Sequence, residues 1–189
     1  MLVYLHGFNS SPASRKSCLL AQRLAAMGRA SELLCPALPD RPAQAIVLIE
    51  AAIAPLPTRN ITLVDSSLNE YYATYLAEKF GMHTVLINPA IIPYEKLRAY
   101  LGPQKNLYTG EPYELTEQHL RELKALAVPR PTRMERYYLM VTSGDEVLDY
   151  RDAVARYAGA KQLVVQGSDH GFADFGEHLD SVLAFAGIG

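Results

Sequence analysis

The sequence predicts an α/β protein, a three-layer sandwich in which helices cover both faces of a mostly parallel central sheet. Short apolar segments alternate along the chain with amphipathic segments of about 10 to 15 residues. This alternation is typical of βαβ units, in which each helix connects two parallel strands. Residues 84–87 are apolar at nearly every position, as expected of a strand that is buried on both faces of the sheet.

The length and composition favour one folded domain that spans residues 1–189. The chain is 49% hydrophobic and 20% charged, which is ordinary for a globular protein, and its net charge is −2. No basic cluster is interleaved with aromatic residues, so nucleic acid and anionic membranes are not expected as partners. The sequence gives no indication of the oligomeric state.

The chain opens on an apolar strand, so we expect no secretory signal, and it has no apolar run long enough to cross a membrane. The two cysteines, Cys18 and Cys35, are expected to be free thiols rather than a disulfide. We therefore expect a cytoplasmic protein.

The individual elements follow from the apolar periodicity and from the Gly and Pro residues that interrupt it. Gly28 ends the first helix, Pro55 and Pro57 end the second, and Pro89 stops the fourth strand. The expected strands cover residues 2–5, 32–35, 61–65, 83–88, 137–142 and 162–166. The expected helices cover residues 14–27, 43–54, 116–126, 149–157 and 174–185, with one more that follows Ser67 and ends near Phe80.

Residues 90–136 interrupt this regular pattern and read as a short lid-like insertion within the single domain. Seven Pro and Gly residues punctuate the segment, and residues 116–126 form its one clear helix. Inserted segments of this length are often lids that face a substrate, although a solvated structural excursion is an equally good interpretation. The segment has too few apolar residues to bury a core of its own.

Four loops that follow predicted strands carry reactive side chains, and they contain His6, Ser67, Asp145 and His170. In an open parallel sheet, the loops at the carboxyl ends of the strands converge on the crevice where ligands bind. Ser67, Asp145 and His170 occur in the Ser, Asp, His order of α/β-hydrolases. Ser67 would be the nucleophile, His170 the base that removes its proton, and Asp145 the carboxylate that orients the imidazole.

The nucleophile is expected at a strand-turn-helix bend between residues 61 and 76. The elbow pattern G-x-S-x-G, placed on residues 65–69, selects Ser67 over the adjacent Ser66. The oxyanion of the reaction would be held by the backbone N–H of Leu68 and by a second N–H from residues 6–8. Phe8 is the preferred second donor, and Asn9 is the alternative.

Each of these residues also has a structural interpretation. Asp149 or Asp169 could replace Asp145 as the acid, and an Asp after a strand is often a helix cap or a turn former. His6 is expected to hydrogen-bond within its loop rather than to act as a base. The remaining histidines are His83, His119 and His178.

The sequence resembles the YqiA/YcfP-like esterases, a small branch of the α/β-hydrolases, nearly from end to end. The resemblance implies an α/β-hydrolase-like fold and an esterase of acyl esters that uses no metal or organic cofactor. It also places the nucleophile at Ser67, the acid at Asp145 and the base at His170. The similar segments are residues 4–12 (YLHGFNSSP), 66–68 (SSL), 71–74 (YYAT), 88–90 (NPA), 108–110 (YTG), 144–151 (GDEVLDYR) and 170–172 (HGF).

The chain departs from this family at the elbow itself. The family has glycine where this chain has Asp65, Asn69 and Glu70. Asp and Asn tolerate unusual backbone angles, so the turn could form without glycine. A carboxylate about 4 Å from the oxyanion would cost about 4 kcal/mol at an effective dielectric near 20, or roughly three orders of magnitude in rate.

We therefore expect a serine esterase that hydrolyses small or medium acyl esters, with activity weakened by the loss of the glycines. The alternative is an impaired α/β-hydrolase fold, altered by chance or by design, that serves as a binding or scaffold module. A weaker hypothesis is a metal-assisted hydrolase that uses Asp65, Glu70 and a histidine.

Overall fold

A computed structural model of the chain describes residues 1–67 and 70–189. Among these residues, six strands form one sheet in the order β2-β1-β3-β4-β7-β8, and every neighbouring pair is parallel. The predicted fold class, with its mostly parallel central sheet, is confirmed. The strands are β1 (Leu2–Leu5), β2 (Leu33–Leu34), β3 (Thr62–Ser66), β4 (His83–Ile87), β7 (Tyr137–Thr142) and β8 (Lys161–Val165).

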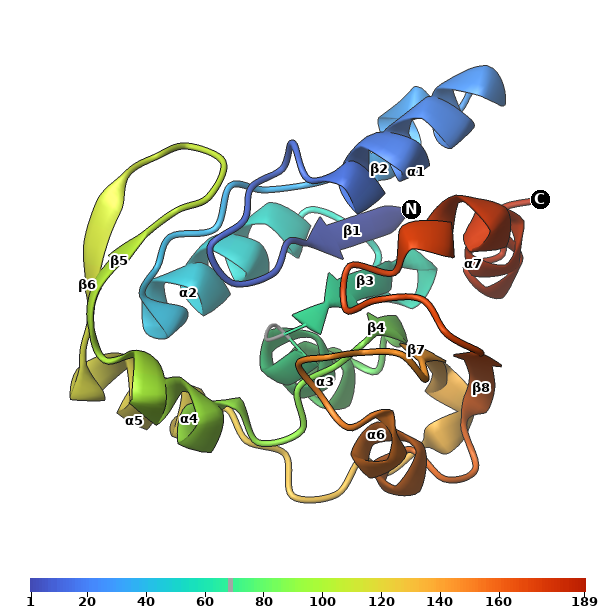
Figure 1. Ribbon diagram of the computed structural model, residues 1–189. Coiled ribbons are helices and arrows are strands. Elements are labelled where there is room, and N and C mark those ends of the chain that lie inside the picture. The colour runs from blue at the N-terminus through green and yellow to red at the C-terminus, as the bar shows by residue number, and fades with distance from the viewer. Residues whose placement is uncertain (68–69) are drawn as a thin grey trace.

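Helices cover both faces of this sheet (Figure 1). On one face, α1 and α7 pack through Leu20, Leu24 and Val182 onto β1, β3, β4 and β7. On the other face, α2, α3 and α6 share a second apolar cluster with the sheet. The helices are α1 (Arg15–Ala26), α2 (Pro42–Ile53), α3 (Glu70–Phe80), α4 (Pro93–Lys96), α5 (Glu117–Ala125), α6 (Tyr150–Arg156) and α7 (Leu179–Phe185).

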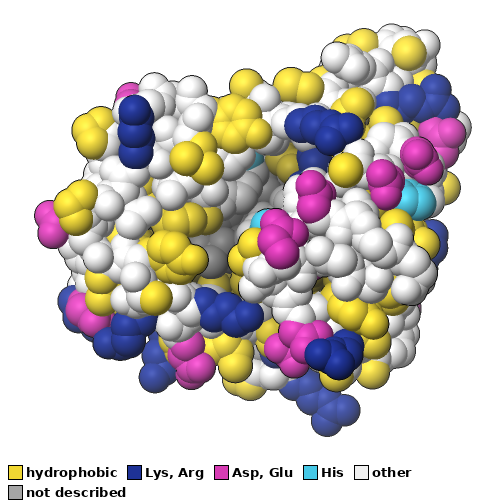
Figure 2. All heavy atoms as spheres, viewed as in Figure 1, with side chains coloured by type: hydrophobic (Ala, Val, Ile, Leu, Met, Phe, Trp, Pro, Cys, Tyr) yellow, Lys and Arg dark blue, Asp and Glu magenta, His cyan; other side chains and the backbone are white. Residues whose placement is uncertain are grey.

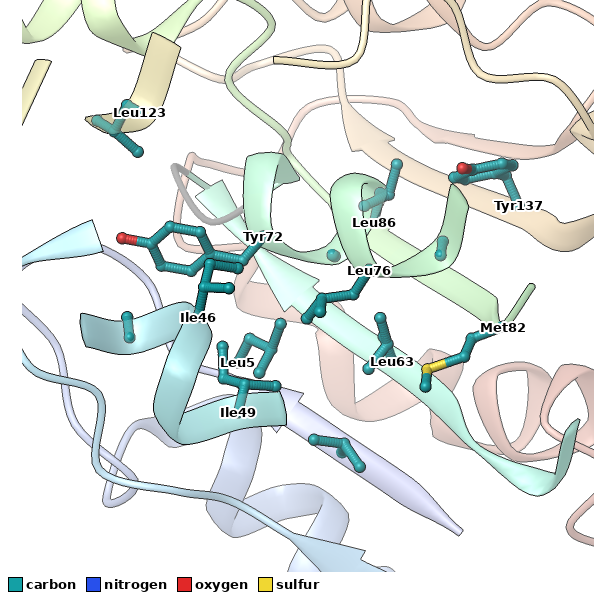
Figure 3. Close-up of a cluster of buried hydrophobic side chains, with 14 of the residues drawn as sticks. Leu5, Ile46, Ile49, Leu63, Tyr72, Leu76, Met82, Leu86, Leu123 and Tyr137 are labelled. Atoms are coloured by element: carbon teal, nitrogen blue, oxygen red, sulfur yellow. The ribbon is translucent and has the colours of Figure 1, made fainter. Parts of the chain in front are cut away.

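Figure 3 shows how this second cluster is assembled from distant parts of the chain. Ile46 and Ile49 of α2 lie beside Leu5 of β1, and Leu76 of α3 lies above Leu63 of β3. Parallel strands that are covered on both faces carry apolar side chains at nearly every position. The burial of all residues in β1, β3 and β7 agrees with this rule.

The segment 90–136 contains more structure than its sequence suggested. Besides the expected helix, now α5, it forms the short helix α4 and an antiparallel hairpin of β5 (Gly102–Lys105) and β6 (Pro112–Leu115). The hairpin projects away from the main sheet, at the left of Figure 1. Leu120 and Leu123 of α5 are buried in the same cluster as α2 and α3, so the segment packs onto the body of the molecule.

Two expected elements lose residues to 3₁₀ turns. Glu32 belongs to the 3₁₀ helix η1 (Ala30–Glu32), and β2 ends at Leu34, before Cys35. The predicted helix 174–185 is divided into the 3₁₀ helix η6 (Ala173–His178) and α7. No helix in residues 1–67 or 70–189 combines the length and the apolar character that crossing a membrane requires.

Candidate active site

Ser67 lies at the bend between β3 and α3, with its backbone in the left-handed region (φ 68°). A non-glycine residue rarely adopts this conformation, and in native proteins such residues are held by the surrounding structure and are concentrated at functional sites. The carbonyl oxygen of Ser67 accepts a hydrogen bond from the backbone N–H of Ala90 (3.0 Å), which follows β4. This bond ties the bend to the neighbouring strand.

The side chains of Ser67, His170 and Asp145 meet in one hydrogen-bonded chain, although they come from three separate loops. Ser67 Oγ lies 3.0 Å from His170 Nε2, and His170 Nδ1 lies 2.8 Å from Asp145 Oδ2. Asp145 Oδ1 accepts the backbone N–H groups of Val147 and Leu148, each at 2.8 Å. The carboxylate is therefore fixed from one side while it faces the imidazole from the other.

Asp145 is held in its ionised form. Burial acts to raise its pKa, but the hydrogen bonds from His170 and from the amides of Leu148 and Val147 outweigh burial and place the pKa below its ordinary value. An ionised carboxylate accepts the Nδ1–H of the imidazole, which leaves Nε2 free to take the serine proton. The geometry is thus suited to general-base activation of Ser67.

Close backbone packing brings the two loops of Asp145 and His170 together. A Cβ atom at Gly144 would lie only 2.3 Å from the carbonyl oxygen of Ser168, so a side chain cannot be accommodated there. In addition, the backbone N–H of His170 donates to Glu146 Oε2 (3.0 Å). The glycine that precedes Asp145 is therefore required by the approach of the next loop.

Asn88 holds the His170 loop in place through hydrogen bonds, a role that the sequence did not predict. Its amide nitrogen donates to the carbonyl oxygen of His170 (3.0 Å) and to Thr142 Oγ1 (3.1 Å), and its amide oxygen accepts the N–H of Thr142 (2.9 Å). Asn88 is 2% exposed and has a left-handed backbone (φ 44°). The signals in the sequence are a polar residue, followed by Pro89, at the end of an apolar strand, and the place of residues 88–90 among the segments that resemble the family.

Of the two expected oxyanion donors, Leu68 lies outside the described residues. Phe8 belongs to the loop after β1, and this loop lies directly against the nucleophile bend. A Cβ atom at Gly7 would be 3.0 Å from the carbonyl oxygen of Ser66 and 3.6 Å from Cβ of Ser67. Asn9, the alternative donor, has a left-handed backbone (φ 55°) that turns the loop.

The hairpin of the insertion holds this loop through several hydrogen bonds. Tyr113 OH donates to Asn9 Oδ1 (2.7 Å), and the N–H of Leu107 donates to the carbonyl oxygen of Asn9 (2.9 Å). Asn106 Nδ2 donates to the carbonyl oxygen of Ser10 (2.8 Å), and the rings of Phe8 and Tyr113 meet edge to face. The conformation of the loop thus depends on the insertion.

The alternative acids have structural partners. Asp149 caps α6 by accepting the N–H of Arg151 (3.0 Å) and also pairs with the Arg151 guanidinium. Asp169 Oδ1 accepts the N–H of Ala173 (3.1 Å) within the turn that follows His170.

The other histidines lie outside the hydrogen-bonded chain of Ser67. His6 Nε2 accepts the backbone N–H of Leu38 (3.0 Å), as expected of a residue that organises its loop. His119 is buried and forms the capping box of α5 with Thr116, whereas His83 contacts Phe185 and His178 contacts Phe172.

Asp65 and Glu70, which stand where the family has glycine, are both completely buried. Burial, and next the proximity of Glu70, raises the pKa of Asp65 well above its ordinary value, and neither of its carboxylate oxygens has a hydrogen-bond partner among the described residues. Burial also raises the pKa of Glu70, although Arg156 opposes this effect. Both shifts act against the ionised forms, and Arg156 pairs with Glu70, so the expected repulsion of an oxyanion is reduced.

Glu70 is also the centre of a buried network at the start of α3. Its Oε1 accepts from Thr74 Oγ1 (3.1 Å), Arg156 Nε (3.4 Å) and the hydroxyl of Tyr157. Arg156 in turn donates to the carbonyl oxygens of Val128 (2.6 Å) and Pro129 (3.3 Å) in the insertion. The residue that replaces the glycine is therefore integrated into the fold.

A cavity of about 510 Å³ lies beneath the insertion, next to the loop of Gly7 and Phe8. Figure 2 shows the hollow between the insertion and the body of the molecule, with hydrophobic side chains on much of its visible wall. A second depression of about 320 Å³ is formed by residues 143 and 145–151. The first has the size of small-molecule sites, and residues 6–10 form part of its wall.

Within residues 1–67 and 70–189, no three His, Cys, Asp or Glu side chains are grouped so that they could hold a metal ion. Asp65 and Glu70, which the metal-assisted hypothesis required, are buried inside the fold rather than directed toward the cavity wall.

A comparison with protein families identifies the family to which this chain belongs. The profile of an uncharacterised protein family, UPF0227, matches residues 1–187. The chain belongs to the UPF0227 family. This is the family of the YqiA/YcfP-like proteins, and the resemblance of the motifs is thereby confirmed.

Solved structures with the same fold are distant in sequence from this UPF0227 protein. Mouse alpha/beta hydrolase domain-containing protein 10 is 11% identical with a TM-score of 0.70, and the match covers 97% of this chain and 89% of that chain. Est1E from Butyrivibrio proteoclasticus is 16% identical with a TM-score of 0.67, covering 98% and 85%. The esterase domain of a Rhodothermus marinus protein is also 16% identical, with a TM-score of 0.66 and coverage of 98% and 85%. These likenesses show an α/β-hydrolase fold.

Proposed function

We propose that this UPF0227 protein is a serine esterase that hydrolyses acyl esters of small molecules. The observation that carries the proposal is the hydrogen-bonded chain from Ser67 Oγ through His170 to Asp145, with distances of 3.0 and 2.8 Å. These separations are within the range required for proton transfer between a nucleophile and its base. The esterases and hydrolases that share the fold support the same reaction class.

The proposed hydrolysis proceeds in two steps. In the first, His170 Nε2 takes the hydroxyl proton of Ser67 while Oγ attacks the ester carbonyl, and the imidazolium then protonates the leaving alcohol. In the second, His170 removes a proton from water, which attacks the acyl-enzyme and releases the carboxylic acid and Ser67. Asp145 stabilises the imidazolium in both steps, and the N–H groups of Phe8 and Leu68 are the proposed oxyanion donors.

Hydrolysis of p-nitrophenyl butyrate by the wild-type protein and two serine variants tests this proposal. We expect Ser67→Ala to lower kcat by about 10³-fold or more, because the nucleophile is lost. Ser66→Ala is the matched control, since Ser66 is adjacent to the nucleophile but belongs to β3. Equal rates for the wild type and Ser67→Ala would contradict the proposal and would favour the binding or scaffold role.

A further inference from the structure

The cavity beneath the insertion lies on one side of the nucleophile, and the base lies on the other. His170 follows β8, and the sheet order places β8 on the β4 and β7 side of β3. The cavity is lined by residues 6–10 after β1 and by residues 38–40 after β2, which lie on the opposite side of β3. Ser67, at the end of β3, therefore stands between the base and the cavity.

This arrangement determines which half of an ester enters the cavity. The oxygen of the leaving alcohol must receive a proton from the imidazolium, so it must face His170. The acyl group then extends in the other direction, past Gly7, into the cavity. Gly7 lies where the cavity meets the nucleophile bend, since it lines the cavity and packs against Ser66 and Ser67.

Apolar side chains form one part of the cavity wall, and polar side chains form the rest. Its lining includes Leu38, Leu97, Leu115 and Leu123, which are contributed by the loop after β2 and by the insertion. Tyr72 of α3 also reaches the lining, and Figure 3 shows its ring extending away from Leu76 and Leu86 toward Ile46 and Leu123. Such a wall favours hydrocarbon groups and has room for acyl chains longer than acetyl.

The charged residues of the lining all carry the same sign. They are Asp40 and Glu111, and the described lining contains no Lys or Arg. Asp40 Oδ2 lies 3.2 Å from His119 Nε2, whose other nitrogen, Nδ1, accepts the N–H of Thr116 (3.1 Å). Nδ1 of His119 is thus occupied by the Thr116 amide, and only Nε2 faces the Asp40 carboxylate, whose side chain is 41% exposed. The neighbouring Arg41 forms its ion pair with Glu122, and it also interacts electrostatically with Asp40.

We propose, on the basis of the esterase function above, that the cavity is an acyl site for uncharged apolar chains and that Asp40 and Glu111 exclude acyl groups with a free carboxylate. The two carboxylates, which are both exposed to solvent, would repel a terminal carboxylate that enters the cavity, whereas an uncharged chain meets no such repulsion. Esters of monocarboxylic acids are then substrates, and half-esters of dicarboxylic acids are not.

The test compares p-nitrophenyl hexanoate with mono-p-nitrophenyl adipate, two esters whose acyl chains have equal length and differ in a terminal carboxylate. We expect kcat/KM of the wild-type protein to be at least about tenfold lower for the adipate. The double variant Asp40→Asn/Glu111→Gln should reduce this ratio to about threefold or less. Equal rates for the two esters in the wild type, or an unchanged ratio in the double variant, would overturn the inference while leaving the esterase function intact.

A binding measurement on Ser67→Ala keeps the inference testable if no ester is hydrolysed. N-butylhexanamide should raise the Tm of this variant, whereas the corresponding monoamide of adipic acid should not. A similar rise with both amides, or no rise with either, would show that the cavity does not select uncharged acyl chains.

Discussion

Ser67 keeps a left-handed backbone although the glycines typical of a nucleophile elbow are absent around it. Asp65 is part of β3, so its backbone is extended and does not itself need the conformational freedom of glycine. The replacement by Asp instead introduces a polar group into a site of complete burial. The substitution therefore costs free energy through burial of the carboxyl group and leaves the backbone conformation unchanged.

The carboxyl group of Asp65 should make stability depend on pH. Because its pKa is raised in the folded state, the folded protein keeps a proton that the unfolded chain releases above its ordinary pKa. The free energy of unfolding of the wild type should therefore fall as the pH rises from that value through the raised pKa. In Asp65→Asn, a neutral side chain of similar shape removes this dependence.

We expect Asp65→Asn to have a Tm at least about 3 °C above the wild type at pH 7.5 and a Tm similar to the wild type near pH 4. Thermal unfolding at several pH values measures the difference. Glu114→Gln, at an exposed position in the hairpin, is the control and should show no such trend. A difference between Asp65→Asn and the wild type that stays constant with pH would show that Asp65 is not held as a neutral acid.

At the scale of elements, the hairpin β5–β6 and its turn hold the loop that carries Phe8, the proposed oxyanion donor. Tyr113, Asn106 and Leu107 all donate hydrogen bonds to Asn9 or Ser10, next to the proposed donor Phe8. A displacement of this loop by a fraction of an ångström would move an N–H group away from the position of the oxyanion. The insertion is thus expected to contribute to the rate as well as to the wall of the cavity.

Tyr113→Phe tests this role, because it removes one hydrogen bond and keeps the ring. We expect kcat for p-nitrophenyl butyrate to fall about tenfold, with KM changed by less than about twofold, since the loop stabilises the transition state rather than the bound ester. Tyr108→Phe, at an exposed tyrosine of the same hairpin, should leave both constants unchanged. An increase in KM at constant kcat would indicate that Tyr113 acts only as part of the cavity wall.

The helices and strands could be predicted wherever burial requires a recognisable pattern of apolar residues in the sequence. Residues 2–5 and 137–142 were predicted to the residue, because both strands are completely buried. The hairpin was missed, since its strands contain Gly102, Pro103 and Pro112 and have few of the β-branched residues that indicate a strand. It is stabilised by contacts with residues far away in the sequence, such as Asn9.

For the molecule as a whole, the sequence predicted the parallel sheet and which loops converge, because the order of strands and helices largely determines both. It did not predict the supporting residues Asn88 and Glu146, whose roles arise only when β4, β7 and the His170 loop are packed together. The sequence analysis also overestimated how strongly Asp65 and Glu70 would repel an oxyanion. Sequence alone did not indicate that Asp65 and Glu70 would be completely buried, or that Arg156 would reach Glu70 from α6.

The central claim is that Ser67 is activated by His170 and Asp145. Intact-mass and peptide mapping after reaction with a fluorophosphonate test it most directly, because this reagent phosphonylates a serine that is activated by a neighbouring base. We expect a single adduct on Ser67, absent in Ser67→Ala, present in Ser66→Ala and formed much more slowly in His170→Ala. No adduct on the wild-type protein, or labelling that persists in Ser67→Ala, would contradict it.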